Sequence, residues 1–557
     1  MVTKYVATDP SVGNDNNSGD DAGHPWLNFQ KSIDRLVALR TNPNETNILY
    51  ILNFQVNEPA VLNGPRYSKF QFIGVMIANV DNDPHHDALF CEPRVRLTSW
   101  DPTKPIFTVE QADDILFKDL QLFDSVGGGG IVARKAKQVH VLTCCIHDNK
   151  SKRGAGFLFE GCTEPLVTRC RVVHNQATDA HGGGAFDTCK DARIVGSVFF
   201  TNDAARSGGA LSFDNCTGDI SIEQNTFGDM QIHGNTAWRG GAVSAERCAK
   251  IMFGSPRGFN TYKWNEALHE GGAVWLNLCK EAAVVRDVYF ENRTVKQGGA
   301  LCARGTDLTL AEVKMELNHA ARGGGIFASG KDPNFNVIGG KLIMESSELR
   351  RNDAVYAGGG VAADWIDVAI ARCAFLDTNK AGSFGGGLAF EDSLLDHGKK
   401  LDIQGGTFQE NRSKIGGGGC DITGGQVSIH GTAFEDNRAY SGGGLRYIGN
   451  SKSTFTADTC HFIDNESDTA GGAVELRVAD RGRFQKNTIS GNKAGFAAGL
   501  FLVGCDVRSL NVSGNDFSAN KTTDIFVGTD KSKPPMTAAE LEHNNAVAKA
   551  VPVVKIW

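Results

Sequence analysis

The chain has 557 residues and a formal net charge of −7, with 41% hydrophobic and 22% charged residues. Glycine contributes 66 residues, about 12% against the usual ~7%, and proline only 15, so the sequence is neither collagen-like nor a proline-rich disordered chain. No apolar run reaches the ~18 residues of a transmembrane helix, and the mildly acidic balance argues against a dedicated nucleic-acid binder. We therefore expect neither membrane insertion nor a nucleic-acid partner.

Residues 1–45 are predicted to form an N-terminal entry segment and cap. A short strand over residues 5–8 precedes a polar turn rich in Asn, Asp and Gly, and an amphipathic helix begins near Phe29. The first residues contain neither an apolar signal-peptide region nor a small-residue cleavage site. The sequence in this numbering thus predicts no signal peptide. We expect a cytoplasmic protein, or a secreted one if the sequence starts at a mature end.

Residues 46–525 contain an internal repeat. Fourteen glycine-rich triplets, mostly Gly-Gly-small before an apolar residue, recur with a mean spacing of about 28 residues. Many repeats also carry an apolar residue three positions before an Asn, as in Phe434 with Asn437. The segments between these signals alternate in polarity with period two, which is typical of strands. The third triplet positions are 130, 156, 183, 210, 242, 273, 300, 325, 360, 387, 419, 444, 473 and 499.

This repeat predicts an all-β fold, a single-stranded right-handed parallel β-helix solenoid of about 14 or more coils. Each coil is expected to hold three short strands, and equivalent residues of successive coils would stack about 4.8 Å apart. Glycine suits the corners because it accepts positive φ, and turn Asn side chains can form a ladder from coil to coil. Residues 526–557 are predicted to be a C-terminal cap, helical over residues 536–550.

The 14 cysteines are interpreted as thiols, because they are widely spread and form no CxxC pair. Five of them stand six residues after their triplet positions in consecutive coils. A redox or metal ladder is one interpretation of this column, but a buried stack of small hydrophobic side chains is favoured. These five are Cys162, Cys189, Cys216, Cys248 and Cys279.

Two resemblances support this fold. Residues 5–33, with their short strand, polar turn and amphipathic helix, resemble the entry segment of pectate-lyase-like β-helix proteins. The pattern of residues 462–465 followed by residues 471–474 resembles the GGA and FxxN repeats of chlamydial polymorphic outer-membrane proteins. The resemblances imply a β-helix but leave function open, because this fold carries lyases, hydrolases, epimerases, spikes and adhesins.

Candidate catalytic residues come from the strand after each triplet. Residues one and three positions on are expected to point inward, and residues two and four positions on to point outward. Four consecutive coils carry a carboxylate at the fourth position, and like charges about 5 Å apart raise pKa values. A solvated charged face is the alternative interpretation. The fourth positions are Arg134, Glu160, Asp187, Asp214, Glu246, Asn277, Arg304, Ser329, Asp364 and Glu391.

We assign Asp187, Asp214 and Glu246 as the acid, base or nucleophile set. Carboxylates on adjacent coils would lie near 5 Å apart, as in retaining glycosidases, and those two coils apart near 9–10 Å, at the upper end of the inverting range. A lyase would instead need a basic residue and a charge neutraliser, commonly Ca²⁺ on carboxylates. The sequence does not choose between them, and calcium is the one cofactor considered.

The coils on either side of position 242 are longer than average, and their extra residues are expected to wall a groove with Glu246 at its bottom. Trp238 and Trp275 lie nearby and are predicted to be stacking platforms for sugar rings, Trp275 because its position points outward. A Trp packed under a loop is the alternative.

Further polar residues complete the predicted site. His269 and Glu270 are auxiliary proton carriers, and Arg206, Arg239 and Arg304 bind substrate. Ordinary ion pairs between coils would explain many of these residues equally well.

The leading hypothesis is a carbohydrate-active enzyme, either a glycoside hydrolase or a polysaccharide lyase, with a poly- or oligosaccharide substrate. The rival hypothesis is a non-catalytic surface, spike or adhesin protein, in which the repeated coil presents a binding face.

Overall fold

The computed structural model describes residues 1–7, 11–52, 59–75, 95–229, 234–332, 334, 336–376, 378–392, 398–479, 481–505, 509–528, 545–547 and 554–556. The chain divides into two compact units. The N-terminal unit comprises Met1–Ala267, Ala273–Trp275 and Cys279–Glu281. The C-terminal unit comprises Leu268–Gly272, Leu276–Leu278 and Ala282–Trp557.

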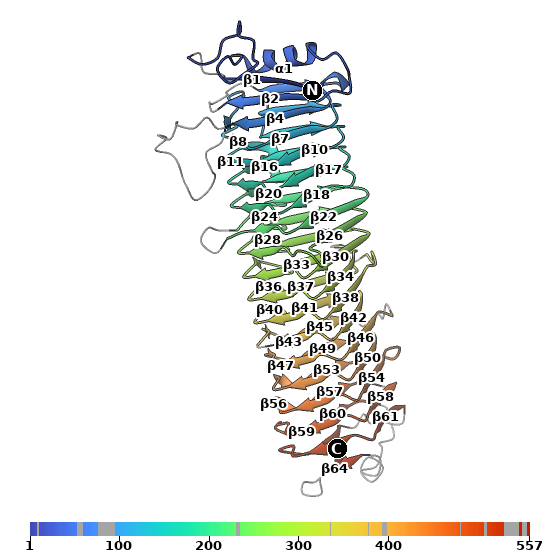
Figure 1. The fold of residues 1–557 in the computed structure, drawn as a ribbon. Coiled ribbons are helices and arrows are strands. Elements are labelled where there is room, and N and C mark those ends of the chain that lie inside the picture. The colour runs from blue at the N-terminus through green and yellow to red at the C-terminus, as the bar shows by residue number, and fades with distance from the viewer. Residues whose placement is uncertain are drawn as a thin grey trace. The chain divides into compact units, whose positions relative to one another are not determined.

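The N-terminal unit begins with the predicted strand and helix. Strand β1 (Val2–Val6) pairs in parallel with β2 (Asn47–Leu52), and helix α1 (Phe29–Ala38) lies between them in the sequence (Figure 1). The helix starts at Asn28, whose side chain accepts a hydrogen bond of 2.8 Å from the Lys31 backbone N–H. It buries an apolar face that includes Phe29 and Leu36. The predicted short strand and the helix beginning near Phe29 are therefore confirmed. The helix predicted over residues 536–550 falls largely outside the described residues.

Both units are right-handed parallel β-solenoids, with about 16 turns in all, so the predicted fold is confirmed. One turn shows the pattern. It contains β14 (Leu166–Thr168), β15 (Arg171–Val173), β16 (Gln176–Ala180) and β17 (Gly184–Asp187). Each strand pairs in parallel with its equivalent one turn later, and we name the four resulting stacks sheets A, B, D and C in that order.

The prediction of three strands per coil was wrong, because the glycine-rich corner divides the third side of the coil into sheets D and C. Gly208 shows why glycine is needed there. Its φ is +65°, and an added Cβ would lie 2.3 Å from the Leu211 carbonyl oxygen and 2.8 Å from the Cβ of Ser212. A side chain at this corner would collide with the next strand.

Sheets A and B form the other two sides of each turn. In the N-terminal unit, sheet A includes β4 (Phe70–Val75), β7 (Ile115–Lys118), β10 (Val139–Leu142), β18 (Arg193–Val195), β22 (Asp219–Glu223) and β26 (Lys250–Phe253). Sheet B there includes β5 (Val95–Leu97), β8 (Leu120–Phe123), β11 (Cys145–His147), β19 (Val198–Phe200), β23 (Thr226–Phe227) and β27 (Thr261–Lys263). In the C-terminal unit, sheet A includes the strands from β34 (Asp307–Ala311) to β61 (Leu510–Ser513). Sheet B includes there the strands from β31 (Val288–Phe290) to β62 (Asp516–Ser518).

Sheets C and D carry the residues discussed below. In the N-terminal unit, sheet D contains β12 (Lys150–Arg153), β16, β20 (Asp203–Ser207) and β24 (Thr236–Arg239), and sheet C contains β3 (Ala60–Asn63), β6 (Phe107–Glu110), β9 (Ile131–Arg134), β13 (Phe157–Glu160), β17, β21 (Leu211–Asp214) and β25 (Val243–Glu246). In the C-terminal unit, sheet D contains β32 (Arg293–Thr294), β36 (His319–Arg322), β40 (Asp353–Ala357), β44 (Lys380–Ala381), β48 (Arg412–Ser413), β52 (Arg438–Ser441) and β56 (Glu466–Ala470). Sheet C there contains β33 (Leu301–Arg304), β37 (Ile326–Ser329), β41 (Val361–Asp364), β45 (Leu388–Glu391), β49 (Cys420–Thr423), β53 (Leu445–Ile448), β57 (Val474–Arg477), β60 (Leu500–Val503) and β63 (Ile525–Gly528).

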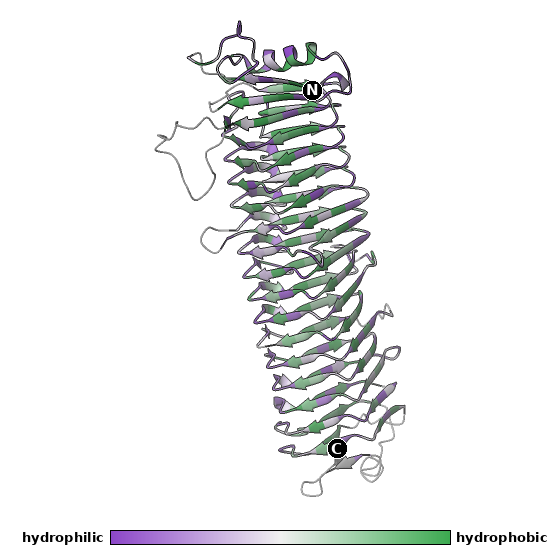
Figure 2. Ribbon diagram, in the orientation of Figure 1, coloured by the Kyte–Doolittle hydropathy of each residue, from purple (hydrophilic) through white to green (hydrophobic). Residues whose placement is uncertain are grey.

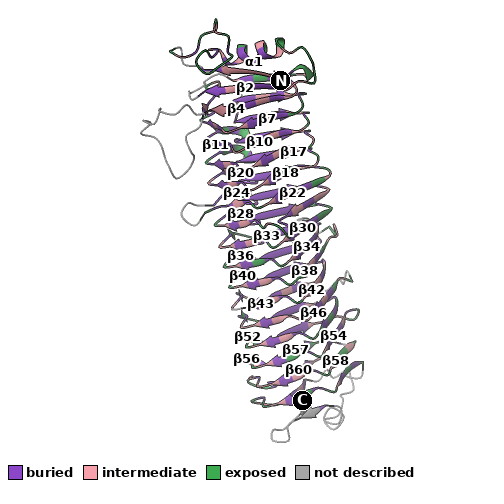
Figure 3. Cartoon of the chain, in the orientation of Figure 1, coloured by how far each residue is buried: buried purple, intermediate pink, exposed green. Residues whose placement is uncertain are grey.

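The core consists of like residues stacked on like. In the C-terminal unit, the rings of Phe408, Phe434 and Phe462 are parallel, with centroids 5.0 and 4.9 Å apart. Apolar residues concentrate on the strands, and buried positions recur in every turn (Figures 2 and 3). The predicted Asn ladder is also present, because Asn149 and Asn175 are buried and the Asn149 side-chain amide donates to Asn175 Oδ1 at 3.0 Å. The ladder satisfies backbone groups that the B to D corner would otherwise leave unpaired.

The predicted cysteine column is confirmed. Its five thiols are at most 1% exposed. Each donates to a backbone carbonyl on sheet C of the preceding turn, as Cys216 does to Phe186 at 3.3 Å. The interpretation of every cysteine as a thiol was wrong, however, because Cys145 is disulfide-bonded. Cys91 lies outside the described residues, and the other twelve cysteines form no disulfide bond and are buried.

Candidate functional site

The predicted carboxylate column lies on sheet C of the N-terminal unit. Strands β9, β13, β17, β21 and β25 pair in unbroken register, which aligns their fourth residues in one column. Successive members are one inter-strand spacing apart, about 4.8 Å. The column contains Arg134, Glu160, Asp187, Asp214 and Glu246.

Arginines neutralise the two ends of this column. Arg134 Nε lies 2.6 Å from Glu160 Oε2. Arg153, at the end of β12, donates from Nη2 to Asp187 Oδ2 at 2.9 Å. Arg247 Nη1 lies 2.6 Å from Glu246 Oε1. Glu160, Asp187 and Glu246 are therefore all held in short ion pairs.

Asp214 is the exception. Its nearest arginine atom, Arg247 Nη2, lies 3.5 Å away, and its close hydrogen bond comes from the neutral amide of Asn215 at 2.9 Å. Partial burial raises the pKa of Asp214, and the neighbouring charges of Glu246 and Asp187 raise it further against the opposing effect of Arg247. Asp214 is thus the member of the column best suited to hold and release a proton.

The sequence did not reveal Arg153 and Arg247 as partners of the column. Arg247 follows directly after β25 with a φ of +51°, and the equivalent Asn215 has a φ of +50°. This left-handed turn brings the side chain after the strand back beside the fourth position. For Arg247, the available signal was the polar residue that stands five positions after some of the triplets, as Lys135 and Asn215 do.

The prediction that the second position of sheet C points into solvent was wrong. Trp275 is 4% exposed, and the Arg239 guanidinium lies over its ring at 5.1 Å. The sharp corner between sheets D and C covers these positions, including the buried cluster of Val132, Leu158 and Ala185. Trp275 is therefore not a stacking platform, and Arg239 is engaged with it.

Trp238 does reach solvent, with 44% of its surface exposed. It precedes Arg239 on β24, so the two side chains point to opposite faces of that strand. Trp238 and Trp275 consequently do not share one surface. Arg206 is also exposed, and it lies 3.5 Å from Asp179 on sheet D.

The groove predicted around Glu246 was also wrong. The inserted residues lie between β23 and β24 and between β26 and β27, at the B to D and A to B corners. Neither insertion follows β21 or β25, whose ends carry Asp214 and Glu246. The Glu246 side chain is accordingly 32% exposed.

The remaining predicted residues form a separate cluster in the C-terminal unit. Glu270 is buried and accepts from the buried Arg304 at 2.7 Å. His269 Nδ1 lies 3.7 Å from Glu270, and its Nε2 lies 2.8 Å from the Lys296 amine. A buried, arginine-bound carboxylate is suited to holding neighbouring turns together, and a substrate has no access to it.

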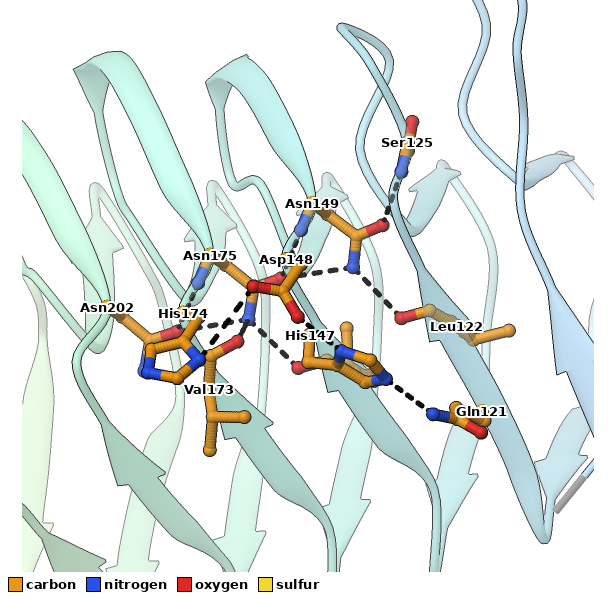
Figure 4. A network of polar contacts seen from close by, with 11 residues as sticks. Gln121, Leu122, Ser125, His147, Asp148, Asn149, Val173, His174, Asn175 and Asn202 are labelled. Atoms are coloured by element: carbon orange, nitrogen blue, oxygen red, sulfur yellow. Dashed lines mark hydrogen bonds and ion pairs between the residues drawn. The ribbon is translucent and has the colours of Figure 1, made fainter. Parts of the chain in front are cut away.

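One polar cluster of the N-terminal unit was missed by the sequence reasoning. Asp148 lies 2.6 Å from His147 Nδ1 and 3.8 Å from His174 Nδ1, and Gln121 contacts the other nitrogen of His147 at 2.6 Å (Figure 4). Asp148 and His174 each precede a ladder asparagine, which brings them together one turn apart. Their place next to the Asn ladder was the signal available in the sequence.

Two general properties bear on function. Among the described residues, no group of three or more His, Cys, Asp or Glu side chains is arranged to hold a metal ion. Calcium binding therefore stays a prediction. Within the same residues, no helix has the length and apolar character needed to span a bilayer.

Residues 108–249 match the family model described as "Right handed beta helix region", which agrees with the fold of that stretch. No curated protein matches the sequence significantly. Nothing in these comparisons supports the resemblance to chlamydial polymorphic outer-membrane proteins.

Solved structures with some likeness to the chain include three β-helix proteins. PfbA, a surface adhesin of Streptococcus pneumoniae, is 9% identical with a TM-score of 0.21, covering 91% of both chains. The catalytic domain of a GH87 alpha-1,3-glucanase is 11% identical with a TM-score of 0.22, covering 98% of this chain and 68% of that one. A mannuronic acid specific family 6 lyase from human gut microbiota is 9% identical with a TM-score of 0.25, covering 98% and 91%. We draw nothing about function from likenesses of this size.

Proposed function

We propose that the N-terminal unit is a carbohydrate-active enzyme that hydrolyses glycosidic bonds at the outer edge of sheet C. The observation that carries this proposal is the position of Asp214, a carboxyl with a raised pKa between two carboxylates in arginine ion pairs. General acids in glycosidases are carboxyls kept protonated by such surroundings.

Asp214 is assigned as the proton donor to the leaving oxygen. Glu246 is assigned as the nucleophile, because it stands one strand spacing away, about 5 Å, which is the separation used by retaining glycosidases. Its Oε1 lies 2.6 Å from Arg247 Nη1. After the protonated leaving group departs, water would give a proton to Asp214 and attack the anomeric carbon of the glycosyl–Glu246 ester. This attack breaks the bond between the sugar and Glu246 and restores both carboxyl groups.

The test is Asp214→Asn, assayed with the full chain against a panel of soluble polysaccharides. Reducing ends report hydrolysis, and ultraviolet absorbance of an unsaturated product reports a lyase. Turnover of Asp214→Asn should fall by roughly 10²–10⁴-fold, the usual contribution of general acid catalysis. Normal turnover by this variant would remove Asp214 from the mechanism, and unsaturated products would replace hydrolysis with elimination.

A matched control is available in the C-terminal unit. Glu391 also occupies the fourth position of a sheet C strand and lies 3.3 Å from Arg322. Glu391→Gln removes a carboxylate in the same local setting, so its turnover should match that of the unmodified protein.

A further inference from the structure

The outer face of sheet D in the C-terminal unit carries a stripe of exposed apolar side chains. Four successive strands of this sheet pair in order, namely β40, β44, β48 and β52. Their first residues align in one row from turn to turn: Asp353, Lys380, Arg412 and Arg438. A buried small residue follows on each strand, and the exposed apolar residues come one to three positions after it. We call these residues the sheet D stripe: Val355, Tyr356, Phe384, Ile415 and Tyr440.

The stripe is unusual for a soluble surface. Tyr356 is 60% exposed and Tyr440 is 53% exposed, and both are large side chains without a core role. Four successive turns at about 4.8 Å each extend the stripe over roughly 15 Å. Contiguous exposed apolar surface of this kind marks a binding site more often than chance.

One ring of the stripe is held in place from below. The Arg446 guanidinium lies 4.9 Å from the centroid of Phe384, and its Nε is bound to Asp421 at 2.6 Å. Arg446 and Asp421 are both buried. Phe384 is therefore a fixed platform, and a fixed platform loses little conformational entropy when a ligand binds.

A polar groove runs beside the stripe on the same face. Its volume is about 450 Å³. Arg438 stands two residues before Tyr440 on β52, so the two side chains point to the same side of the strand. The groove is lined by Glu410, Arg412, Asp436, Arg438, Asp464, Glu466 and Lys493.

Most of these charges have no protein partner. Arg438 is paired with Asp468 at 3.0 Å. Within the described part of the chain, no side-chain hydrogen bond or ion pair is made by five lining residues, namely Glu410, Arg412, Asp436, Asp464 and Lys493. Their donors and acceptors are directed to solvent and are free for a ligand.

We propose that the sheet D stripe and this groove together bind a linear, uncharged polysaccharide. The apolar faces of sugar rings would stack on Tyr356, Phe384 and Tyr440, and the hydroxyl groups would bond to the unpaired carboxylates and bases. Four acids and three bases nearly cancel, which favours a ligand without net charge. A protein partner would need a broad apolar core over about 800 Å² per side, whereas this stripe is one column wide.

This inference does not depend on the activity proposed for Asp214, because it concerns binding by the C-terminal unit alone. Failure of Asp214→Asn to affect turnover would leave it intact, and loss of the stripe would leave the proposed chemistry intact.

The test measures binding of the full chain to a soluble β-glucan and a galactomannan, with polygalacturonate as the acidic probe, by calorimetry and affinity electrophoresis. Tyr356→Ala and Tyr440→Ala should each weaken binding to a neutral polymer roughly 10-fold, and the double variant should abolish it. Val295→Ala is the matched control, since Val295 is an exposed apolar residue of the same unit outside the stripe.

Four outcomes would overturn the proposal. Neither neutral polymer binds, or the tyrosine variants bind as tightly as the unmodified chain. Alternatively, binding is confined to polygalacturonate and falls steeply with salt, which would indicate a charge-driven site. Self-association of the unmodified chain that both tyrosine variants abolish, measured by sedimentation, would assign the stripe to a second copy instead.

Discussion

The two units use the same position of sheet C in opposite ways. At the second position, the N-terminal unit carries apolar or small residues such as Leu158 and Ser212, while three successive turns of the C-terminal unit carry Asp421, Arg446 and Glu475. All of these side chains are buried. The backbone therefore decides that the position is covered, and either apolar packing or compensated charge can fill it.

The outer face of sheet D shows the reverse contrast. In the N-terminal unit it carries mainly polar residues such as Lys152, Asp179 and Arg206, with Trp238 as an exposed aromatic, while the C-terminal unit carries the sheet D stripe. The sheet D strands pair in parallel in both units and show the same kind of register shift in both, so the difference lies in side-chain chemistry and not in backbone geometry. One repeated coil thus offers a charged edge in one unit and an aromatic face in the other.

The largest effect is expected from breaking the buried charge network. Arg446→Ala removes the partner that lies 2.6 Å from the buried Asp421 and should lower the free energy of unfolding by about 3–5 kcal/mol. Denaturant unfolding followed by circular dichroism measures this change. Ser212→Ala is the control at the equivalent position of the N-terminal unit, where the hydroxyl has no hydrogen-bond partner among the described residues. It should be neutral or slightly stabilising, and a similar loss for both variants would contradict the comparison.

An intermediate effect is expected from pH, with opposite signs in the two units. Burial raises the pKa of Asp421 to about 6, above its unfolded value of about 3.9, so the native state holds a proton that the unfolded chain has released. The contribution of Asp421 to the free energy of unfolding is fully present below pH ~4 and is lost as the pH rises through about 6. Burial, together with the charge of Arg153, lowers the pKa of His181 to about 4, below its unfolded value of about 6.5. Stability from His181 is present above pH ~6.5 and is lost as the pH falls through about 4.

The measurement compares unfolding free energies at several pH values for the unmodified chain, Asp421→Asn and His181→Gln. Each titration should change the free energy of unfolding by about 3 kcal/mol across this window. Removing Asp421 should make stability fall less as the pH rises, and removing His181 should make it fall less as the pH drops. Shifts of the same sign for both variants would refute the assignment.

The smallest effect is expected from the surface counterpart of Arg446. Arg247 is half-exposed and pairs with Glu246 at the edge of the column, so Arg247→Ala should change the unfolding free energy by less than about 1 kcal/mol. The same variant removes the charge that opposes the rise in the pKa of Asp214, so that pKa should increase further. Carboxyl NMR titration follows the pKa, and an unchanged or lower value would contradict the geometry described for the column.

The repeat predicted the register because stacking requires only that like residues recur at a fixed spacing. Phe434 and Phe462, the Asn ladder and the cysteine column all lie where the sequence places them. The column of Asp187, Asp214 and Glu246 was predictable for the same reason. The coverage of Trp275 was not, because it depends on how sharply the chain turns from sheet D to sheet C.

The sequence by itself thus determined the solenoid, its parallel register and the alignment of the carboxylates, since these follow from short-range periodicity repeated many times. The tertiary structure alone decided which outward positions are buried and which arginines meet which carboxylates. The pKa of Asp214 is raised because the fold partly buries this carboxyl between Glu246 and Asp187. Arg153 and Arg247 oppose the rise, but their close ion pairs are with Asp187 and Glu246. Such pairings join side chains of neighbouring turns, and a pattern read along one coil does not specify them.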